Sequence, residues 1–201
     1  MDNHLWKIEN YRDFLKARRE LISIKLNEFL DGFVQEESIT AVRPVAETIS
    51  RGESSHVEFK STLQWDIVAE KQNPELRNSV LKTLVAFMNT HGGTLLIGVE
   101  DSGHIFGIEK DLMGLGGSDD RFLQLLSKII ADKIGPHFSI FTDFRIENID
   151  DKKVCVVNVS KASEPVFMDG KNGRQFYARI GNITRSLDAE QTLEYIETNG
   201  L

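Results

Sequence analysis

The sequence has a single cysteine, Cys155, among its 201 residues, so an internal disulfide and a cysteine-based zinc cluster are both excluded. No apolar stretch reaches the roughly 18 residues that are needed to cross a bilayer. The N-terminal MDNHLWKIEN lacks the basic-then-apolar order of a secretory signal. We therefore expect a cytoplasmic protein without a membrane partner. Cys155 lies in the apolar run KVCVVNV, which predicts a small core residue.

Positive charge is also scarce. The chain has 24 lysines and arginines against 31 aspartates and glutamates, which gives a net charge of −7. Because nucleic acids are held by clustered lysine and arginine, this balance argues against a protein that coats nucleic acid through bulk charge. A local basic groove stays compatible with it. Apolar residues make up 40% of the chain and charged residues 27%, as is typical of a globular domain.

Several catalytic and nucleotide-binding motifs are missing. The sequence contains no GxxxxGK[ST] and no GxGxxG between a strand and a helix, so we expect no ATP site. Gly92-Gly93 falls at a predicted helix end, where the macrodipole repels phosphate. There is no HExxH or close histidine pair for zinc and no GxSxG elbow for a serine nucleophile. The candidates for chemistry are therefore carboxylates, lysines and arginines, and His56 or His104 is either a general base near the carboxylates or an exposed histidine.

The N-terminal region has the periodicity of one amphipathic helix over residues 8–33, which would pack on the domain or on a partner. Residues 34–52 are polar and interrupted by Pro44, with a short helix expected near Val45–Ile49. We therefore assign residues 1–50 to an N-terminal amphipathic helix with its connector, and residues 51–201 to a compact domain.

The domain alternates between strand and helix patterns. This alternation predicts a mixed α/β or α+β fold, with antiparallel hairpins beside one buried strand. The run TLLIGV is nearly all apolar, which is typical of a central strand covered on both faces. Asn73 is a predicted N-cap with Pro74 at the first helical position, and Asp188 is the expected cap of the terminal helix. The expected helices run from 74 to about 91, from 119 to 133 and from 188 to about 198. The expected strands cover 56–60, 94–99, 104–108, 138–148, 153–159, 165–168 and 174–180.

The stretch ESSHVEFK, residues 53–60, carries the first candidate site. Glu58 and Lys60 share one face of the expected strand, and Val57 and Phe59 share the other. Glu53 stands five positions before Glu58. In a regular strand the two acids would point to opposite faces, so they converge only if the chain bends between them.

Glu100 and Asp101 end the run TLLIGV. If that strand neighbours the first one, three or four carboxylates meet at one sheet edge. Such a cluster favours Mg²⁺ or Mn²⁺ and suits phosphodiester cleavage, with Lys60 stabilising phosphate charge or positioning a water. The alternative is a solvated strand face with a surface ion pair between Glu58 and Lys60.

A second candidate site lies in FYARIGNITR, residues 176–185. Arg179 and Arg185 flank Gly181-Asn182, and a turn there would offer backbone N–H groups and two guanidinium groups to a phosphate. The alternative is a hairpin end that leads into the last helix.

Three motifs in this order resemble the Schlafen AlbA_2 domain, which in bacteria is also described as a DNA-binding or divergent AAA-4 domain. They are ESSHVEFK, LVAFMNTHGGTLLIGVEDSGHIFGI and FYARIGNITR, and the resemblance covers roughly residues 50–190. The AAA-type name implies ATP binding, for which the sequence has no Walker motif.

The resemblance implies that three carboxylates cut structured RNA such as transfer RNA with a divalent metal. The motif E-S-x-x-V-E-F-K assigns Glu53 and Glu58 as two of them, and Lys60 matches the motif's lysine. The third follows the G-V-D-D strand end, which here reads Gly98-Val99-Glu100-Asp101 and leaves Glu100 and Asp101 as alternatives. Schlafen cores of animals have two related lobes, so a homodimer of this single-copy chain is a further expectation.

Three functions remain open at this point. The first is a nucleic-acid-binding domain with metal-dependent endoribonuclease activity, in which Glu53, Glu58, Glu100 and Asp101 supply the metal ligands. Lys60, Arg179 and Arg185 would then contact the nucleic acid. The second is a non-catalytic DNA-binding or regulatory module that uses only the basic residues. The third is a protein-interaction module that docks a partner through the N-terminal helix.

Overall fold

The computed structural model describes residue 18, residues 44–171 and residues 173–201. The chain divides into two compact units, 1–44 and 45–201, and almost all described residues belong to the second. The helix expected over residues 8–33 lies outside the described residues. Helix α2 (Val45–Arg51) includes the short helix expected near Val45–Ile49 and belongs to the second unit, which therefore starts a few residues before the expected boundary at 51.

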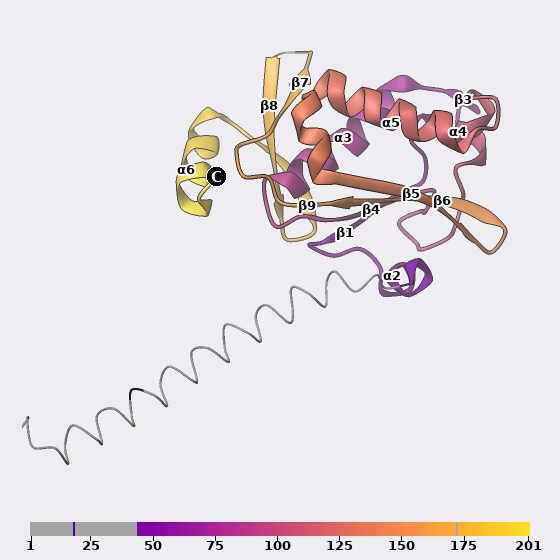
Figure 1. Ribbon diagram of the computed structural model, residues 1–201, viewed down its shortest axis with the longest axis horizontal. Coiled ribbons are helices and arrows are strands. Elements are labelled where there is room, and N and C mark those ends of the chain that lie inside the picture. The colour runs from indigo at the N-terminus through magenta and orange to yellow at the C-terminus, as the bar shows by residue number, and fades with distance from the viewer. Residues whose placement is uncertain (1–17, 19–43, 172) are drawn as a thin grey trace, which may run out of the picture. The chain divides into compact units, whose positions relative to one another are not determined.

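A four-stranded mixed sheet forms the centre of the domain (Figure 1). Its strand order is β1-β4-β6-β5, with β1 parallel to β4 and the other neighbours antiparallel. The strands are β1 (Val57–Lys60), β4 (Gly93–Ile97), β6 (Lys152–Val159) and β5 (Thr142–Ile149). The parallel pair needs a crossover, which helix α3 provides. The predicted mixed α/β class is confirmed.

A second, antiparallel sheet of three strands follows in the chain, with β8 (Gly173–Ile180) between β7 (Phe167–Gly170) and β9 (Ile183–Leu187). It packs between α3 and the terminal helix α6 (Ala189–Asn199) (Figure 1). A third, minimal sheet is the hairpin of β2 (Trp65–Asp66) and β3 (Lys71–Gln72), directly after β1. The sequence patterns predicted neither this hairpin nor β9.

Three helical segments begin directly after a residue whose side chain caps the helix N-terminus. Asn73 accepts a hydrogen bond from the Glu75 N–H at the start of the 3₁₀ turn η2 (Pro74–Leu76), which continues into α3 (Arg77–Met88). Ser118 caps α5, which runs over the predicted residues Asp119–Lys133. Asp188 and Gln191 form a reciprocal capping box at α6. The remaining helical segments are α4 (Glu109–Met113) and the 3₁₀ helix η3 (Pro136–Phe141).

Two expected strands need correction. Residues 104–108 form no strand, because only Ile105 pairs, in an isolated bridge with Val99. The strand expected over 138–148 starts only at Thr142, because Pro136 opens the 3₁₀ helix η3 before it.

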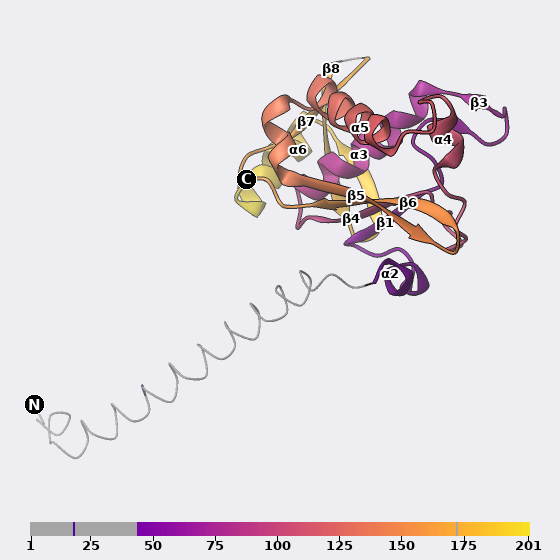
Figure 2. The same cartoon turned by 45° about the vertical axis from the view of Figure 1, so that its right-hand side comes forward.

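The apolar core lies on both faces of the main sheet. Helices α3 and α5 cover one face and α2 lies against the other (Figures 1 and 2). In β4, Leu95 and Ile97 pack into the first cluster and Leu96 into the second, as its continuous apolar run predicts. Cys155 is completely buried, and burial raises the pKa of its thiol to about 12. The expected core role of this cysteine is confirmed, and its thiol stays protonated at neutral pH.

Candidate functional site

The acids of ESSHVEFK are brought together by a bend. The Ser54 N–H donates to the Val57 carbonyl oxygen at 3.0 Å, so the chain folds back on itself before β1. The Glu53 carboxylate then accepts a hydrogen bond from the Phe59 N–H at 2.9 Å. Because β1 is an edge strand, this bond satisfies a backbone donor that has no neighbouring strand. Glu53 therefore lies alongside β1 despite the odd spacing.

Glu58 is held between two cations. One carboxylate oxygen accepts a hydrogen bond from the Lys60 ammonium, and the other lies 2.5 Å from Arg179 Nη1. The side chains of Glu58 and Lys60 are 13% and 23% exposed. The ion pair between Glu58 and Lys60 is therefore present, but it is largely covered instead of standing on a solvated face.

Arg179 is an anchor within the fold. Its side chain is only 1% exposed, and Nη2 donates to the carbonyl oxygens of Ser54 at 2.7 Å and Val57 at 3.2 Å. Its guanidinium lies 5.3 Å from the ring centroid of Phe87 on α3. In this conformation Arg179 does not offer its guanidinium to a phosphate. It joins FYARIGNITR to ESSHVEFK instead, across 121 residues of sequence.

Arg185 does not join Arg179. In the β8–β9 register Arg179 pairs with Thr184, and Ala178 pairs with Arg185. Consecutive residues of a strand point to opposite faces, so the two arginines lie on opposite sides of the sheet. The two guanidinium groups therefore do not meet at Gly181-Asn182, and the turn is a hairpin end. Arg185 itself is exposed.

Glu100 and Asp101 follow the strand beside β1, as expected. Lys60 is in register with Ile97, and its carbonyl oxygen accepts hydrogen bonds from Gly98 N at 2.8 Å and Val99 N at 3.2 Å. The carboxyl ends of the two parallel strands are thus adjacent. Glu100 is half-buried and Asp101 is exposed in the turn that follows.

The four predicted metal ligands are Glu53, Glu58, Glu100 and Asp101. Among residues 44–171 and 173–201, no group of three or more histidine, cysteine, aspartate or glutamate side chains is arranged to hold a metal ion. Both oxygens of Glu58 already have cationic partners, and one oxygen of Glu53 accepts a backbone N–H. In this arrangement the carboxylates do not fit a divalent cation.

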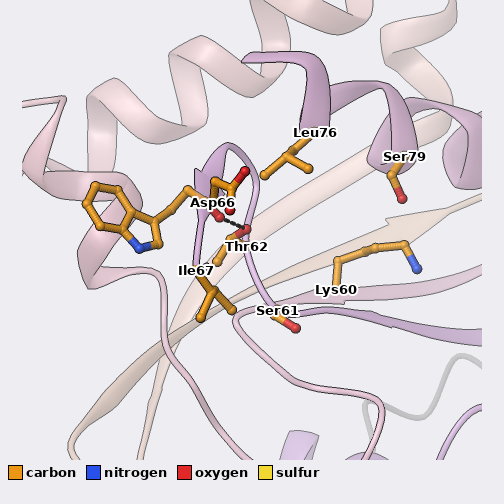
Figure 3. Close-up of a pocket in the computed structure, with 8 residues that line it drawn as sticks. Lys60, Ser61, Thr62, Asp66, Ile67, Leu76 and Ser79 are labelled. Carbon is orange, nitrogen blue, oxygen red and sulfur yellow. Dashed lines mark hydrogen bonds between the residues drawn. The ribbon is translucent and has the colours of Figure 1, made fainter. Parts of the chain in front are cut away.

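A cavity of about 270 Å³ opens at the carboxyl end of β1 (Figure 3). Its walls come from the end of β1, the β2 hairpin and the start of α3. The lining residues are Lys60, Ser61, Thr62, Trp65, Asp66, Ile67, Leu76 and Ser79. The Thr62 hydroxyl donates to the Trp65 carbonyl oxygen at 2.6 Å, which closes the loop between β1 and β2.

Asp111 fixes the backbone of this loop through hydrogen bonds, and the sequence patterns did not predict this role. Its completely buried carboxylate accepts hydrogen bonds from the N–H groups of Leu63, Gln64 and Trp65 at 2.8–2.9 Å. Burial raises the pKa of the Asp111 carboxyl, and the three backbone hydrogen bonds oppose that shift. A lone acid in the short helix EKDLM gives no sequence signal for such a contact 46–48 residues away.

The geometry defines an α/β domain whose three distant motifs meet around one buried ion pair. The family model for "Schlafen, AlbA_2" matches residues 53–188. That match covers more than half of the chain, so the chain belongs to the Schlafen AlbA_2 family, as the resemblance implied. No curated protein matches the chain.

The solved structures that are similar to it include the following two. The DIP2311 protein from Corynebacterium diphtheriae has a TM-score of 0.52 and 22% sequence identity, over 72% of this chain and 24% of that one. The chain therefore spans about a quarter of that protein's length, and the likeness is one of fold. The N-terminal domain of a RecG-related protein from Nitrosomonas europaea has a TM-score of 0.46 and 20% identity, over 74% of this chain and 94% of that domain.

The part of the chain that the structure describes has no helix that is long and apolar enough to cross a membrane.

Proposed function

We propose that this Schlafen AlbA_2 domain binds nucleic acid at the carboxyl end of β1. The observation that carries the proposal is Lys60, a partly exposed cation beside a cavity lined with hydroxyl groups. Lysine and hydroxyl side chains are common contacts of nucleic-acid phosphates, which suits this end of the strand. A single local site also agrees with the acidic composition, because it does not require a broad basic surface.

The other family residues receive separate roles in this proposal. Glu58 orients Lys60, and Arg179 fixes Glu58 and the turn at Ser54. Both are positioning residues. Arg185 is exposed on the opposite face of the second sheet, where it supplies a separate contact to a phosphate of a long ligand.

The test compares binding of labelled transfer RNA and labelled duplex DNA by fluorescence anisotropy. Lys60→Met is expected to weaken binding and to make the negative slope of log K against log salt shallower by about 1, the effect of one lost phosphate contact. Lys152→Met, which changes an exposed lysine at the start of β6, is the matched control. Identical affinities for the Lys60 variant and the wild type would contradict the proposal. Tighter binding of duplex DNA than of transfer RNA would favour the non-catalytic DNA-binding or regulatory module.

A second proposal is metal-dependent endoribonuclease activity, which family membership favours together with the adjacent carboxyl ends of β1 and β4. Mg²⁺ or Mn²⁺ would be held by Glu53, Glu58 and either Glu100 or Asp101. The described arrangement does not fit the ion, so activity requires Glu58 to exchange at least one cationic partner for the metal.

Cleavage of labelled transfer RNA with Mn²⁺ or Mg²⁺ tests this second proposal. Metal-dependent cutting that is lost in Glu58→Gln would support it. Because Glu58→Gln also breaks the ion pair with Arg179, the variants Glu100→Gln and Asp101→Asn are needed as well. If the wild type binds the RNA without cutting it, the nuclease proposal fails and the binding proposal stands.

We also propose that two copies of the chain supply the two lobes that animal Schlafen cores combine in one polypeptide. The single match at residues 53–188 motivates this idea. Sedimentation of the full chain, of 22.8 kDa, should then give twice the monomer mass at micromolar concentration. A monomeric mass at all concentrations would contradict the homodimer.

A further inference from the structure

The cavity beside Lys60 has two chemically distinct ends. Lys60 and Ser79 lie on one side, and Asp66 and Ile67 lie on the other (Figure 3). We infer that this cavity accepts one unpaired nucleotide of a bound strand, with the phosphate at the Lys60 end and the base at the Ile67 end. The inference rests on the proposed nucleic-acid binding and adds the form of the ligand and its place.

The first end offers donors for a phosphate. Lys60 contributes its ammonium, which also donates to the Glu58 carboxylate and to the Phe59 carbonyl oxygen, and Ser79 contributes a hydroxyl group from α3. Ser61 lines the same cavity from the end of β1. Within the described residues neither serine hydroxyl makes a hydrogen bond, whereas the Thr62 hydroxyl is already bound to Trp65. The Ser79 hydroxyl beside the Lys60 ammonium gives suitable partners for phosphate oxygens.

The second end offers apolar surface. Ile67 is 41% exposed, and Leu76 and Trp65 line the same cavity. The Lys110 ammonium lies 5.6 Å from the centroid of the Trp65 ring, which adds positive charge near this wall. Nucleobases stack on aromatic and apolar side chains without regard to their identity, so this wall suits a base whose sequence is not read.

Asp66 is the one acid in the lining, and its charge is already engaged. Its Oδ1 accepts hydrogen bonds from Val68 N at 3.1 Å and Ala69 N at 2.9 Å. The pKa of the Asp66 carboxyl is lowered, mainly by the backbone hydrogen bond from Ala69. Asp66 lies across the cavity from Lys60 (Figure 3). Its repulsion of a phosphate is therefore weakest at the Lys60 end.

The cavity is also preformed. Asp111 fixes the backbone of residues 63–65, and Arg77 Nε donates to the Gln64 side chain at 2.8 Å. A wall that is already ordered loses little conformational entropy when a ligand binds. The volume of about 270 Å³ lies just below the common range for small-molecule pockets, which suits one nucleotide better than a base pair.

The first test measures the affinity of a labelled single-stranded RNA hexamer and of a blunt duplex of the same sequence. Ser79→Phe fills the cavity mouth from an exposed position of α3. We expect it to weaken single-strand binding about tenfold, the effect of one lost stacked base, with little change for the duplex. Asn78→Phe is the matched control, because Asn78 lines a different cavity on the same helix. Equal single-strand affinity for all three proteins would overturn the inference.

The second test does not depend on a cavity variant. Trp6 and Trp65 are the only tryptophans, so Trp6→Phe leaves Trp65 as the single reporter. Adding the hexamer should change Trp65 fluorescence, and the blunt duplex should not. Binding of the hexamer without any change in Trp65 fluorescence would overturn the inference and leave the proposed function intact. If the wild type binds neither RNA, both this inference and the proposed nucleic-acid binding are contradicted. A response to a free nucleoside monophosphate but not to the hexamer would overturn the assignment to a strand.

Discussion

At the scale of the residue, the contact between Arg179 and Glu58 organises the candidate site. It joins β8 to β1 within 2.5 Å, and Arg179 also satisfies the carbonyl oxygens of Ser54 and Val57. Removing one partner from a buried ion pair leaves the other charge and these carbonyl groups without compensation. The family arginine therefore acts on Lys60 indirectly, through the position of Glu58.

We predict that Arg179→Met lowers the free energy of unfolding by about 3 kcal/mol. Urea denaturation followed by circular dichroism measures this change. Arg185→Met is the matched control on the neighbouring strand, and because Arg185 is exposed we expect an effect within about 0.5 kcal/mol. Equal losses in the two variants would mean that the Arg179 contacts do not stabilise the fold.

Asp111 leads to a prediction about pH. Burial raises the pKa of its carboxyl in the folded state, so between the unfolded and folded pKa values the folded state binds more protons. In that window the contribution of Asp111 to stability falls as pH rises, starting from the unfolded pKa near 4. The stability of the wild type relative to Asp111→Asn should therefore decrease as pH rises from about 4. Urea titrations of both proteins at several pH values test this, and a difference independent of pH would contradict it.

At the scale of the element, the junction between α3 and β4 depends on a glycine for two reasons. Gly92 has φ +74°, and a Cβ there would lie 2.4 Å from the Val159 carbonyl oxygen. Gly117 has the same φ, but a Cβ there would meet no atom within 4 Å. The two positions therefore separate backbone strain from steric contact.

We predict that Gly117→Ala costs about 1–2 kcal/mol of stability, the cost of the left-handed conformation alone. Gly92→Ala should cost clearly more, because β6 must also move away. Thermal unfolding of both variants measures the difference. Similar melting temperatures would show that the contact with Val159 is easily relieved.

Elements with local signals were predictable from the sequence. The predicted caps Asn73 and Asp188 accept hydrogen bonds from backbone N–H groups two or three residues further on, and the apolar periodicity alone located α5. Strands with short patterns were not predictable. The β2–β3 hairpin has only two residues in each strand, and too few residues alternate there to reveal a period.

The candidate site was predictable only in part for the same reason. Alternation in ESSHVEFK placed Glu58 beside Lys60, and the bend at Ser54 that Glu53 requires is present. The partner of Glu58 is 121 residues away, and the Asp111 contacts span 46–48 residues. Such pairings depend on how sheets and helices pack, which spacing along the chain does not encode. Adjacent strand ends were predictable, but the direction of each carboxylate was not.

At the scale of the whole molecule, the charge balance limits how the proposed nucleic-acid binding can work. A net charge of −7 opposes a polyanion at long range, so affinity must come from a few close contacts. The preformed cavity and Lys60 offer such contacts at one end of β1. Binding of this kind depends on salt in proportion to the small number of phosphates that it engages.

The affinity of labelled transfer RNA for the full chain, measured across a series of salt concentrations, tests the central claim most directly. We predict saturable binding at low salt, with log K falling linearly against log salt and a shallow slope that reflects a few phosphate contacts. The slope should become shallower by about 1 in Lys60→Met. Absence of binding at low salt, or a slope that Lys60→Met leaves unchanged, would contradict nucleic-acid binding at the carboxyl end of β1.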